Sequence, residues 1–353
     1  GSMELRMYPE GYTVVNVVDL ESYVKGVIPS EVPSSYGMEA LKAQAVCARS
    51  YAYIQMMHNK YEAYGAHVDD SVNFQVYNKQ NQTPETVAAV DETKGQVLSY
   101  KGDIIETYYY STSYGHTGDY EAWNLDKDAY GYLQGVWVRS EENSIDLSDE
   151  KSFLDYISNV DSACYESDLK YFRWNTVLDF QGKDETLLHT IADRKEHQPE
   201  AISYYKDASK TETTDSCSNF GSLQAINVVK RNQSGVILEL ELDFQNGAVS
   251  VQSEYNMRAI LGCGITNINL LDGSSVEMSI LPSAYISIQA KGDGTYAVLG
   301  GGYGHGIGMS QNGAQKLCGQ GFDYKRILNY FYQDTELTEL YQPQNTTKEE
   351  GGA

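Results

Sequence analysis

Hydrophobic and polar positions recur at different spacings along the chain, and these spacings predict its first elements. Residues 12–28 open with alternating β-branched residues (YTVVNVV), which predicts a strand before the segment turns polar. Pro29 and Pro33 bracket the sequence PSEVP. Because proline fixes φ, we expect this short segment to be irregular but stiff.

A helix is expected from about Ser35 to His58, with Ser34 or Ser35 as its cap. Its apolar positions are small residues at helical spacing: Leu41, Ala45, Ala48 and Ala52. Such a narrow face indicates close packing against another element.

The middle of the chain has a weaker pattern. Residues 63–98 are predicted to be rich in loops, and residues 95–113 to form two strands joined at Lys101-Gly102-Asp103. The stretch from about 140 to 220 is the most charged, with one helix candidate (DEKSFLDYI) and one polar loop (KDASKTETTDS).

The last third alternates clearly between apolar and polar residues. Residues 222–300 predict several antiparallel strands, and QNGAQKLCGQG and YKRILNYFY predict two final helices. Residues 343–353 are expected to be a flexible tail. These elements together predict an α+β fold, mainly antiparallel sheet, with a long N-terminal helix and C-terminal helices.

Charge and composition exclude several classes of protein. With 26 basic and 49 acidic residues the formal charge is −23, which argues against binding of nucleic acid or of an anionic membrane surface. No apolar run approaches the ~20 residues that span a bilayer. The 30 tyrosines, against 8 phenylalanines, suit a surface that binds sugars, although compositional drift in a secreted protein explains them equally well.

The five cysteines are widely spaced and include no CxxC, which excludes common zinc-finger and thioredoxin-type patterns. Cys164 and Cys217 could form a disulfide, and an odd number leaves at least one thiol free. Cys47 lies on the small face of the long helix, where a buried, inert thiol is expected. Gly1-Ser2-Met3 is typical of a remnant of an expression tag, so we expect any native signal or anchor to lie upstream.

Glu31 is the first candidate for chemistry, because the two prolines would hold its carboxylate in a defined position. Lys42 and Arg49 are seven residues apart, about two helical turns, so both project from one face of the helix. Two cations near one carboxylate could position a polar substrate. Alternatively, the three are a helix-start acid and two solvated charges.

A second candidate is the segment from Gly300 to Gln315 (GGGYGHGIGMSQNGAQ), in which six glycines fall within nine residues. It fits no nucleotide-binding motif. Glycines let the backbone approach a ligand, so His305, with Ser310 and Gln311 at the following helix start, predicts a functional loop.

Ser111 and Ser113 follow the YYY strand, where hydroxyl groups often line a cleft or simply form a turn. His67 stands beside Asp69 and Asp70, yet no HExxH metal motif is present. There is also no GxSxG motif for a serine nucleophile.

Two long motifs carry a family resemblance. The run VVNVVDLESYVKGVIPSEVPSSYGMEALKAQAVCARSYAY resembles the opening of the stage II sporulation protein D / LytB amidase-enhancer family, and GGGYGHGIGMSQNGAQKLCGQGFDYKRILNYFYQDTEL resembles its closing motif. FQVYNKQ, TYYYSTSYGHTG, YGYLQGV and YFRWNTVLD are similar to family segments between them. The resemblance covers roughly residues 12–136 and 222–337.

The resemblance implies a lytic transglycosylase that cuts the MurNAc–GlcNAc β-1,4 bond of peptide-stripped peptidoglycan strands and leaves 1,6-anhydroMurNAc ends. The family's catalytic acid corresponds to Glu31, and its basic helix residues to Lys42 and Arg49. Hydrolytic glycosidases need two carboxylates, whereas here the sugar's own C6 hydroxyl attacks, so one acid/base suffices. Cleft-lining groups are expected at these positions: Ser111, Ser113, Tyr303, His305, Ser310 and Gln311.

The sequence departs from the family at a metal site. Some members bind zinc through one His and two Cys, but here the segment reads GAHVDDSVNFQVY, with Asp70 and Phe74 at the cysteine positions and only His67 kept. We therefore expect no cofactor and no metal. His116 stands near a position that is basic in many members.

The resemblance also suggests an organisation and a second function. We expect residues 4–136 and 222–342 to form the two parts of the family domain, residues 137–221 an insert-like region and residues 343–353 the tail. Glu31 would lie on one wall of a glycan cleft and the His305 loop on the other. The protein would be exported to the cell wall or held at the membrane facing it. The alternative is a non-catalytic, glycan-binding enhancer whose partner is a cell-wall amidase.

Overall fold

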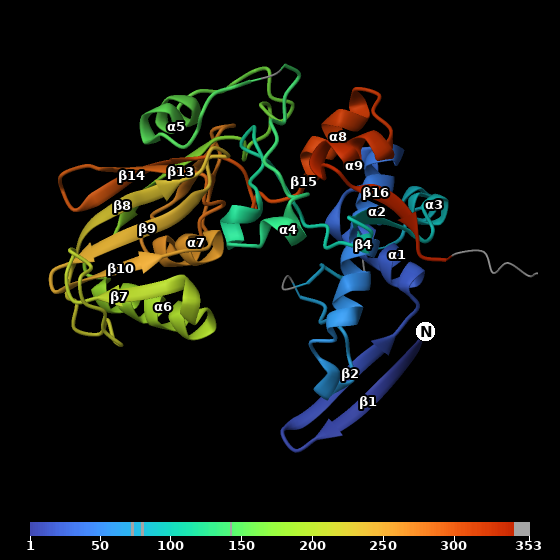
Figure 1. Ribbon diagram of the computed structural model, residues 1–353, viewed down its shortest axis with the longest axis horizontal. Helices are drawn as coiled ribbons and strands as arrows, with labels where there is room; N and C mark the ends of the chain where they lie inside the picture. The colour runs from blue at the N-terminus through green and yellow to red at the C-terminus, as the bar shows by residue number, and fades with distance from the viewer. Residues whose placement is uncertain (72–73, 79–80, 142, 342–353) are drawn as a thin grey trace, which may run out of the picture. The chain divides into compact units, whose positions relative to one another are not determined.

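The computed structural model describes residues 1–71, 74–78, 81–141 and 143–341, which divide into two compact units (Figure 1). Unit 1 comprises residues 1–107, 321–329 and those from 334 onward. Unit 2 comprises residues 108–320 and 330–333. Each unit is described by itself, and the predicted tail 343–353 lies outside the described residues.

Unit 1 combines a hairpin, three helices and a small sheet. The hairpin pairs β1 (Ser2–Tyr8) with β2 (Gly11–Val17). The helices are α1 (Leu20–Glu31), α2 (Met38–His58) and α3 (Pro84–Glu92), and the sheet has the order β16 (Glu336–Glu339), β3 (Gln96–Tyr100), β4 (Asp103–Ile104). The last helix, α9 (Tyr324–Phe331), begins in unit 1 and ends in unit 2.

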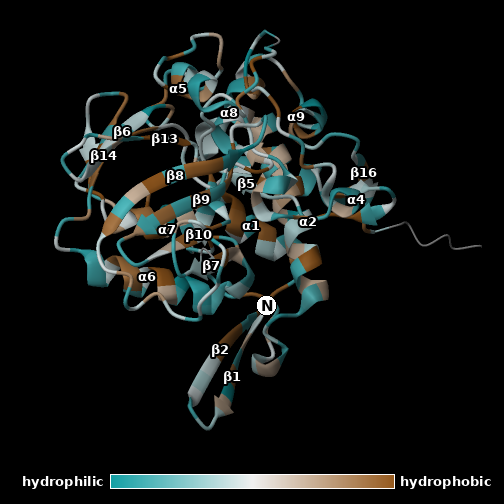
Figure 2. Cartoon of the chain, turned by 60° about the vertical axis from the view of Figure 1, so that its left-hand side comes forward, coloured by the Kyte–Doolittle hydropathy of each residue, from teal (hydrophilic) through white to brown (hydrophobic). Residues whose placement is uncertain are grey.

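The core of unit 1 lies between α1 and α2. Val27 and Ile28 of α1 are fully buried against Leu41 and Ala45 of α2. The small residues predicted to form a narrow face of the long helix do pack closely, as expected. One face of the β1–β2 hairpin, in contrast, leaves apolar side chains in solvent, with Met3, Leu5 and Met7 each more than 60% exposed. Figure 2 shows hydrophobic colouring along this hairpin.

Two local predictions at the start of the chain are wrong. The segment around Pro29 is not irregular, because α1 continues through this proline to Glu31, and burial of its apolar face outweighs the cost of a proline in a helix. The long helix begins at Met38 rather than Ser35, and its N-cap is Gly37 rather than a serine. Gly37 has φ +92°, so the chain changes direction between the preceding turn, residues 34–36, and α2.

The helix α3 lies in the region expected to be rich in loops. Thr83 and Thr86 form a capping box around its first turn, and Pro84 occupies the first helical position. These local signals were present in the sequence and support the helix.

Unit 2 contains two larger antiparallel sheets and the helices that pack on them. The first sheet has the order β7 (Ile202–Tyr205), β10 (Gly247–Val251), β9 (Ile237–Phe244), β8 (Leu223–Arg231). The second has the order β12 (Ser275–Val276), β11 (Ile268–Leu270), β6 (Trp174–Asp179), β14 (Thr295–Gly300), β13 (Ile286–Ala290). Its helices are α4 (Lys127–Tyr130), α5 (Glu150–Ile157), α6 (Asp184–His197), α7 (Glu254–Gly262) and α8 (Gln311–Gly319).

A single hydrophobic core joins these two sheets with α6 and α7. Leu178 of β6, Leu240 of β9, Ile191 of α6 and Ile260 of α7 are all fully buried in it. Since β6 and α6 come from residues 137–221, that charged region contributes a central strand and a core helix to unit 2. The domain boundaries expected from the family motifs stay a prediction.

A third, parallel pair in unit 2 links β5 (Tyr109–Tyr110) to β15 (Met309–Ser310). It brings the YYY segment beside the end of the glycine-rich loop. The predicted α+β fold class is confirmed, as are the helix in DEKSFLDYI, the strands of residues 222–300 and the two final helices. Of the two strands predicted over residues 95–113, the turn at residues 101–103 is confirmed, but the second strand ends at Ile104, and Tyr109–Tyr110 pairs with β15 instead. All five cysteines are free thiols, so Cys164 and Cys217 are not paired.

Candidate functional site

Glu31 is the last residue of α1 and is half-buried in unit 1. Its Oε1 accepts a hydrogen bond of 2.8 Å from the backbone N–H of Val76. The neighbouring Ser30 hydroxyl donates to the Gly26 carbonyl at 3.0 Å and accepts from the N–H of Asn78 at 3.0 Å. Residues 76–78 therefore fix the end of α1 and hold the carboxylate in one position.

Tyr23 and Tyr77 lie near this carboxylate. Tyr23 and Tyr77 stack at 5.6 Å with their planes 5° apart. Gly26 permits this stack, because a Cβ there would lie 2.4 Å from the Tyr77 ring. Burial raises the pKa of Tyr23, and the nearby Tyr51 and Glu31 raise that pKa further, so the Tyr23 hydroxyl keeps its proton. Glu31 is thus in a partly apolar, tyrosine-rich setting.

Arg49 does not lie beside Glu31 as a free cation. It is fully buried, and its Nε and Nη2 donate to the two oxygens of Glu21 at 2.9 and 2.8 Å. Nη1 donates to the Gln96 carbonyl at 3.0 Å and Nη2 to the Val90 carbonyl at 3.2 Å. These contacts tie α2 to α1, α3 and β3, so the structure gives Arg49 a role in the fold, and its expected role in binding substrate stays a prediction.

Lys42 does share a face of α2 with Arg49, as its spacing predicted. Its Nζ lies 2.7 Å from Glu92 and 3.1 Å from Glu39, and hydrogen bonds to these carboxylates raise its pKa. Both cations are therefore paired with carboxylates other than Glu31.

Gln44 is a residue that the sequence analysis missed. It is 2% exposed, and neither atom of its amide has a hydrogen-bond partner among the described residues. At 100° per residue it lies on the face of α2 opposite Lys42, one turn before Ala48, whose carbonyl accepts from the Gln75 side chain at 3.2 Å. Because residues 75–78 also hold Glu31, Gln44 lies on the side of α2 that faces this segment, and its amide is one of several buried polar groups without a hydrogen-bond partner among the described residues.

His305 lies in unit 2, and both of its ring nitrogens interact with backbone groups. Nε2 is 2.8 Å from the Tyr109 carbonyl, and Nδ1 accepts from the Ile307 N–H at 3.1 Å. Burial lowers the pKa of His305 to about 4, so the ring is neutral at physiological pH. The imidazole is not placed to exchange protons with a substrate.

The glycines of this loop are required by close packing. Gly306 has φ +82°, and a Cβ there would lie 2.2 Å from the Tyr285 ring. Gly308 has φ +77°, and its Cβ would lie 2.1 Å from the Tyr108 carbonyl oxygen. The density of glycine, which predicted a functional loop, therefore has a packing cause.

Ser113 and Ser310 meet at a buried carboxylate that the sequence analysis also missed. Glu166 accepts from the N–H and hydroxyl of Ser113, and from the Ser310 hydroxyl at 2.7 Å. Ser310 also caps α8 by accepting from the Gly313 N–H. The side chains of Ser113, Ser310 and Glu166 are all buried. The two serines therefore hold Glu166 against the start of α8. The expectation that these serines contact a glycan does not fit their burial. Glu166 had no local signal, since its burial comes from distant segments.

The remaining predicted residues of unit 2 are Ser111, Gln311 and Tyr303, of which two are half-buried and one is buried. Ser111 is half-buried, and its carbonyl accepts from the backbone N–H and the side chain of Asn312, both at 3.0 Å. Gln311 is buried. Tyr303 is half-buried and stacks on Tyr171 at 4.4 Å. The predicted residues thus fall into two groups, Glu31 with unit 1 and the His305 loop with unit 2, and their expected position across one cleft stays a prediction.

Within the described residues, no three His, Cys, Asp or Glu side chains are grouped to hold a metal ion. Asp69 accepts from the Tyr61 hydroxyl at 2.8 Å, and His67 is exposed. Part of this segment, residues 72–73, lies outside the described residues, so the expected absence of zinc stays a prediction. His116 is buried and its pKa is lowered to about 4, so it does not supply the positive charge found there in many members.

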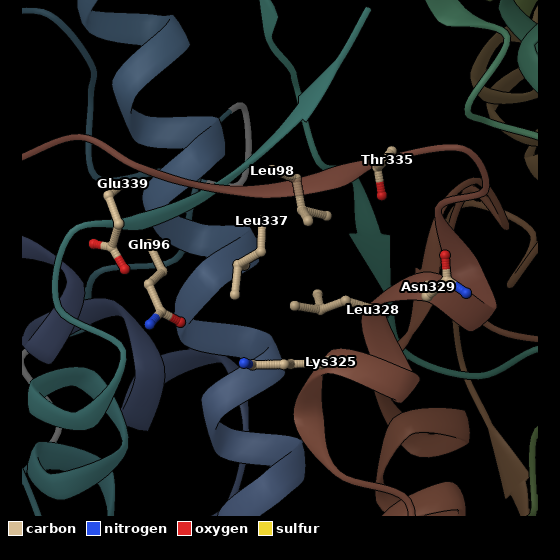
Figure 3. Close-up of a pocket in the computed structure, with 8 residues that line it drawn as sticks. All are labelled: Gln96, Leu98, Lys325, Leu328, Asn329, Thr335, Leu337 and Glu339. Carbon is tan, nitrogen blue, oxygen red and sulfur yellow. The ribbon is translucent and has the colours of Figure 1, made fainter. Parts of the chain in front are cut away.

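Unit 1 also contains a shallow groove of about 430 Å³ (Figure 3). Leu98, Leu328 and Leu337 form its apolar part. The polar residues that line it are Gln96, Lys325, Asn329, Thr335 and Glu339. It contains none of the predicted site residues.

Comparison with known proteins gives two matches to family models. Residues 8–100 match the family model described as stage II sporulation protein, and residues 194–308 match one described as Domain of unknown function (DUF8618). The chain is therefore similar to proteins named stage II sporulation protein D and amidase enhancer. Within the part of the chain that the structure describes, no helix is both long and apolar enough to cross a membrane.

Three relatives illustrate this similarity. The chain is 29% identical to the amidase enhancer of Bacillus subtilis over 89% of its length, but it spans only 40% of that protein. It is 25% identical to stage II sporulation protein D of the same organism, with 96% of the chain and 79% of the relative covered. An uncharacterized protein of Brachyspira hyodysenteriae is 27% identical over 96% of the chain and 72% of its own length.

Proposed function

We propose that this protein acts on the bacterial cell wall as a peptidoglycan lytic transglycosylase, with Glu31 as its single general acid/base. Similarity to stage II sporulation protein D and to an amidase enhancer supports a role connected with the cell wall. The observation that carries the finer proposal is the Glu31 carboxylate, half-buried among tyrosines and held by the Val76 N–H at the end of α1. Such a fixed, partly desolvated carboxylate suits proton transfer in both directions.

In the proposed reaction Glu31 first protonates the glycosidic oxygen that leaves the MurNAc C1. The C6 hydroxyl of the same sugar then attacks C1, and the Glu31 carboxylate takes the hydroxyl proton. The C1–O bond to the leaving sugar breaks, a C1–O6 bond forms, and no water is consumed. One carboxylate therefore serves where hydrolysis would require two.

The unpartnered amide of Gln44 and the buried hydroxyl of Tyr23 belong to the same proposed site, as polar groups around Glu31. Neither Lys42 nor Arg49 belongs to it, because both are paired within unit 1. The proposal places the protein outside the cytoplasmic membrane, where its substrate lies, in the wall or anchored facing it.

The experiment is mass spectrometry of the fragments released from peptide-stripped glycan strands. Wild type should release fragments with 1,6-anhydro ends. Glu31→Gln, which keeps the shape of the side chain, should lower the rate at least ~100-fold, since one acid/base group typically contributes that much. The control is Glu85→Gln, an exposed acid of unit 1, which should cleave like wild type.

Two results would reject the proposal. Cleavage by Glu31→Gln at the wild-type rate would remove Glu31 as the acid. Fragments with ordinary reducing ends would mean hydrolysis, which needs a second carboxylate.

The second candidate function is a glycan-binding enhancer of a cell-wall amidase. It is favoured by the 29% identity to a protein named amidase enhancer. This function would be supported if wild type and Glu31→Gln both bind the glycan strands and neither releases fragments. A cell-wall amidase would then be sought as the partner.

A further inference from the structure

The β1–β2 hairpin of unit 1 presents an apolar face to solvent. In its register Leu5 lies opposite Val14 and Met7 opposite Tyr12, and these four side chains are between 55% and 74% exposed. The other face of the hairpin is packed on the unit, where Val15 is buried. Soluble monomers rarely leave a contiguous apolar patch of this kind uncovered, so the face points to a partner.

Strand β1 is also an unprotected sheet edge. Within the described residues its sheet has only β1 and β2, so each strand has one edge without a neighbouring strand (Figure 1). Edges that avoid further pairing usually carry a proline, a lysine or a bulge. β1 contains neither proline nor lysine, and it pairs with β2 from Ser2 to Tyr8 without a shift in register. A further strand can therefore add along its whole length, and a two-stranded hairpin gains stability from such an addition.

The turn of the hairpin determines which backbone groups face outward. The pair that closes a two-residue turn, here Tyr8 and Gly11, exchanges hydrogen bonds as a rule. Because hydrogen-bonded and non-bonded pairs alternate along an antiparallel ladder, Met3, Leu5 and Met7 point their N–H and C=O groups away from β2. An added strand would bond to these three residues.

The charges of β1 make this edge complementary to itself. Glu4 and Arg6 flank Leu5 in sequence and point to the opposite face of the strand. Their side chains are 44% and 42% exposed, and within the strand Arg6 Nη2 donates to Glu4 Oε2 at 2.8 Å. In a second β1 that runs antiparallel about an axis through Leu5, each Glu4 lies opposite Arg6 of the other copy. The same register places Leu5 opposite Leu5, and Met7 opposite Met3, on the apolar face.

The edge of β2 lacks this complementarity. Antiparallel pairing about Val14 would place Thr13 opposite Val15, which is buried in unit 1, and would form no ion pair. Two copies of a chain with a formal charge of −23 repel each other, so opposite charges at the contact are needed to favour one register. Glu4 and Arg6 supply these charges at the edge of β1.

We propose that β1 binds β1 of a second copy of this chain and forms a four-stranded antiparallel sheet about a two-fold axis at Leu5. Such an interface uses the same residues from both copies and closes on itself as a dimer. The residues that set the register, Glu4 to Met7, lie outside the Gly1-Ser2-Met3 segment that is expected to be a tag remnant. The dimer does not depend on the proposed function.

The test is the mass of the full chain in solution, measured by sedimentation velocity at about 1 to 100 μM. Wild type should form dimers as its concentration rises. Glu4→Arg places two arginines opposite each other, and Arg6→Glu places two glutamates opposite each other. Each variant should therefore weaken self-association at least about 10-fold. An equimolar mixture of the two variants restores both ion pairs and should associate about as tightly as wild type.

A control separates this register from general electrostatics. Glu10→Arg, at the exposed turn, changes the net charge as much as Glu4→Arg does but lies outside the register, so it should not weaken the dimer. If only net charge mattered, Glu4→Arg would reduce the repulsion between copies and tighten association, which is the opposite of the expected result. Recovery in the mixture shows that both variants fold.

Several results would overturn the proposal. Wild type that stays monomeric at about 100 μM would do so, as would wild-type association of Glu4→Arg or failure of the mixture to recover. Dimers that tolerate Glu4→Arg but are lost in Val14→Asp would mean that the apolar faces stack instead. A monomer that sediments with uncharged phosphatidylcholine vesicles would assign the apolar face to a lipid surface.

Discussion

At the scale of single residues, buried polar groups explain why some predicted site residues have structural roles. Arg49 is drawn inside because Glu21 and two backbone carbonyls accept hydrogen bonds from its guanidinium. Its helical spacing correctly placed it on one face with Lys42. Spacing could not show that α3 and β3 would cover that face, because those elements come from later in the chain.

Glu166 gives a pH-dependent prediction. Burial raises the pKa of its carboxyl to about 7, while hydrogen bonds from Ser113 and Ser310 oppose the rise. In the unfolded chain the pKa returns to about 4.3, so the folded state holds the proton more tightly. This contribution to the free energy of unfolding is fully present below about pH 4 and is lost as the pH rises through 7, by about 4 kcal/mol.

Urea denaturation of wild type and Glu166→Gln at several pH values from about 5 to 8 checks this. Stability of the wild type should fall more steeply with rising pH than that of Glu166→Gln, whose side chain does not titrate. Glu185→Gln, an exposed acid on α6, should keep the wild-type slope. Identical slopes in wild type and Glu166→Gln would show that Glu166 titrates normally.

At the scale of elements, local sequence signals located most of the structure. Small residues at helical spacing identified α2, and alternation identified β8 to β10. The segment around Pro29 was wrongly predicted to be irregular because a proline usually ends a helix. Here α1 continues through Pro29, since burial of its apolar face stabilises the helix. The candidate site residues follow the same division: Glu31 was predicted from its local motif, whereas the burial of Glu166 and Gln44 depends on tertiary packing.

The glycine-rich loop leads to a prediction about stability. Gly306→Ala should destabilise the protein by about 2 to 4 kcal/mol, because its φ of +82° is strained for alanine and the new Cβ would overlap the Tyr285 ring. The matched control is Gly319→Ala at the end of α8, where no atom lies within 4 Å of the added Cβ. Thermal unfolding of both variants measures the difference, and equal midpoints would contradict the packing explanation.

At the scale of the whole molecule, the state of the cysteines is a direct test of the fold. With all five thiols free, alkylation of the unfolded, unreduced protein should add five groups by mass spectrometry. A Cys164–Cys217 disulfide would leave only three. In the folded protein Cys164 should react slowly, because burial raises its pKa to about 11 and keeps it as a thiol.

The order of strands in unit 1 has a consequence for synthesis. Strand β3 ends at Tyr100, but its partner β16 begins only at Glu336, after nearly all of unit 2 has been made. At roughly 5–20 residues per second, a ribosome needs on the order of 10 to 50 s to cover that interval. Until then β3 can pair only with β4, so the unit that starts first along the chain is the last to be completed.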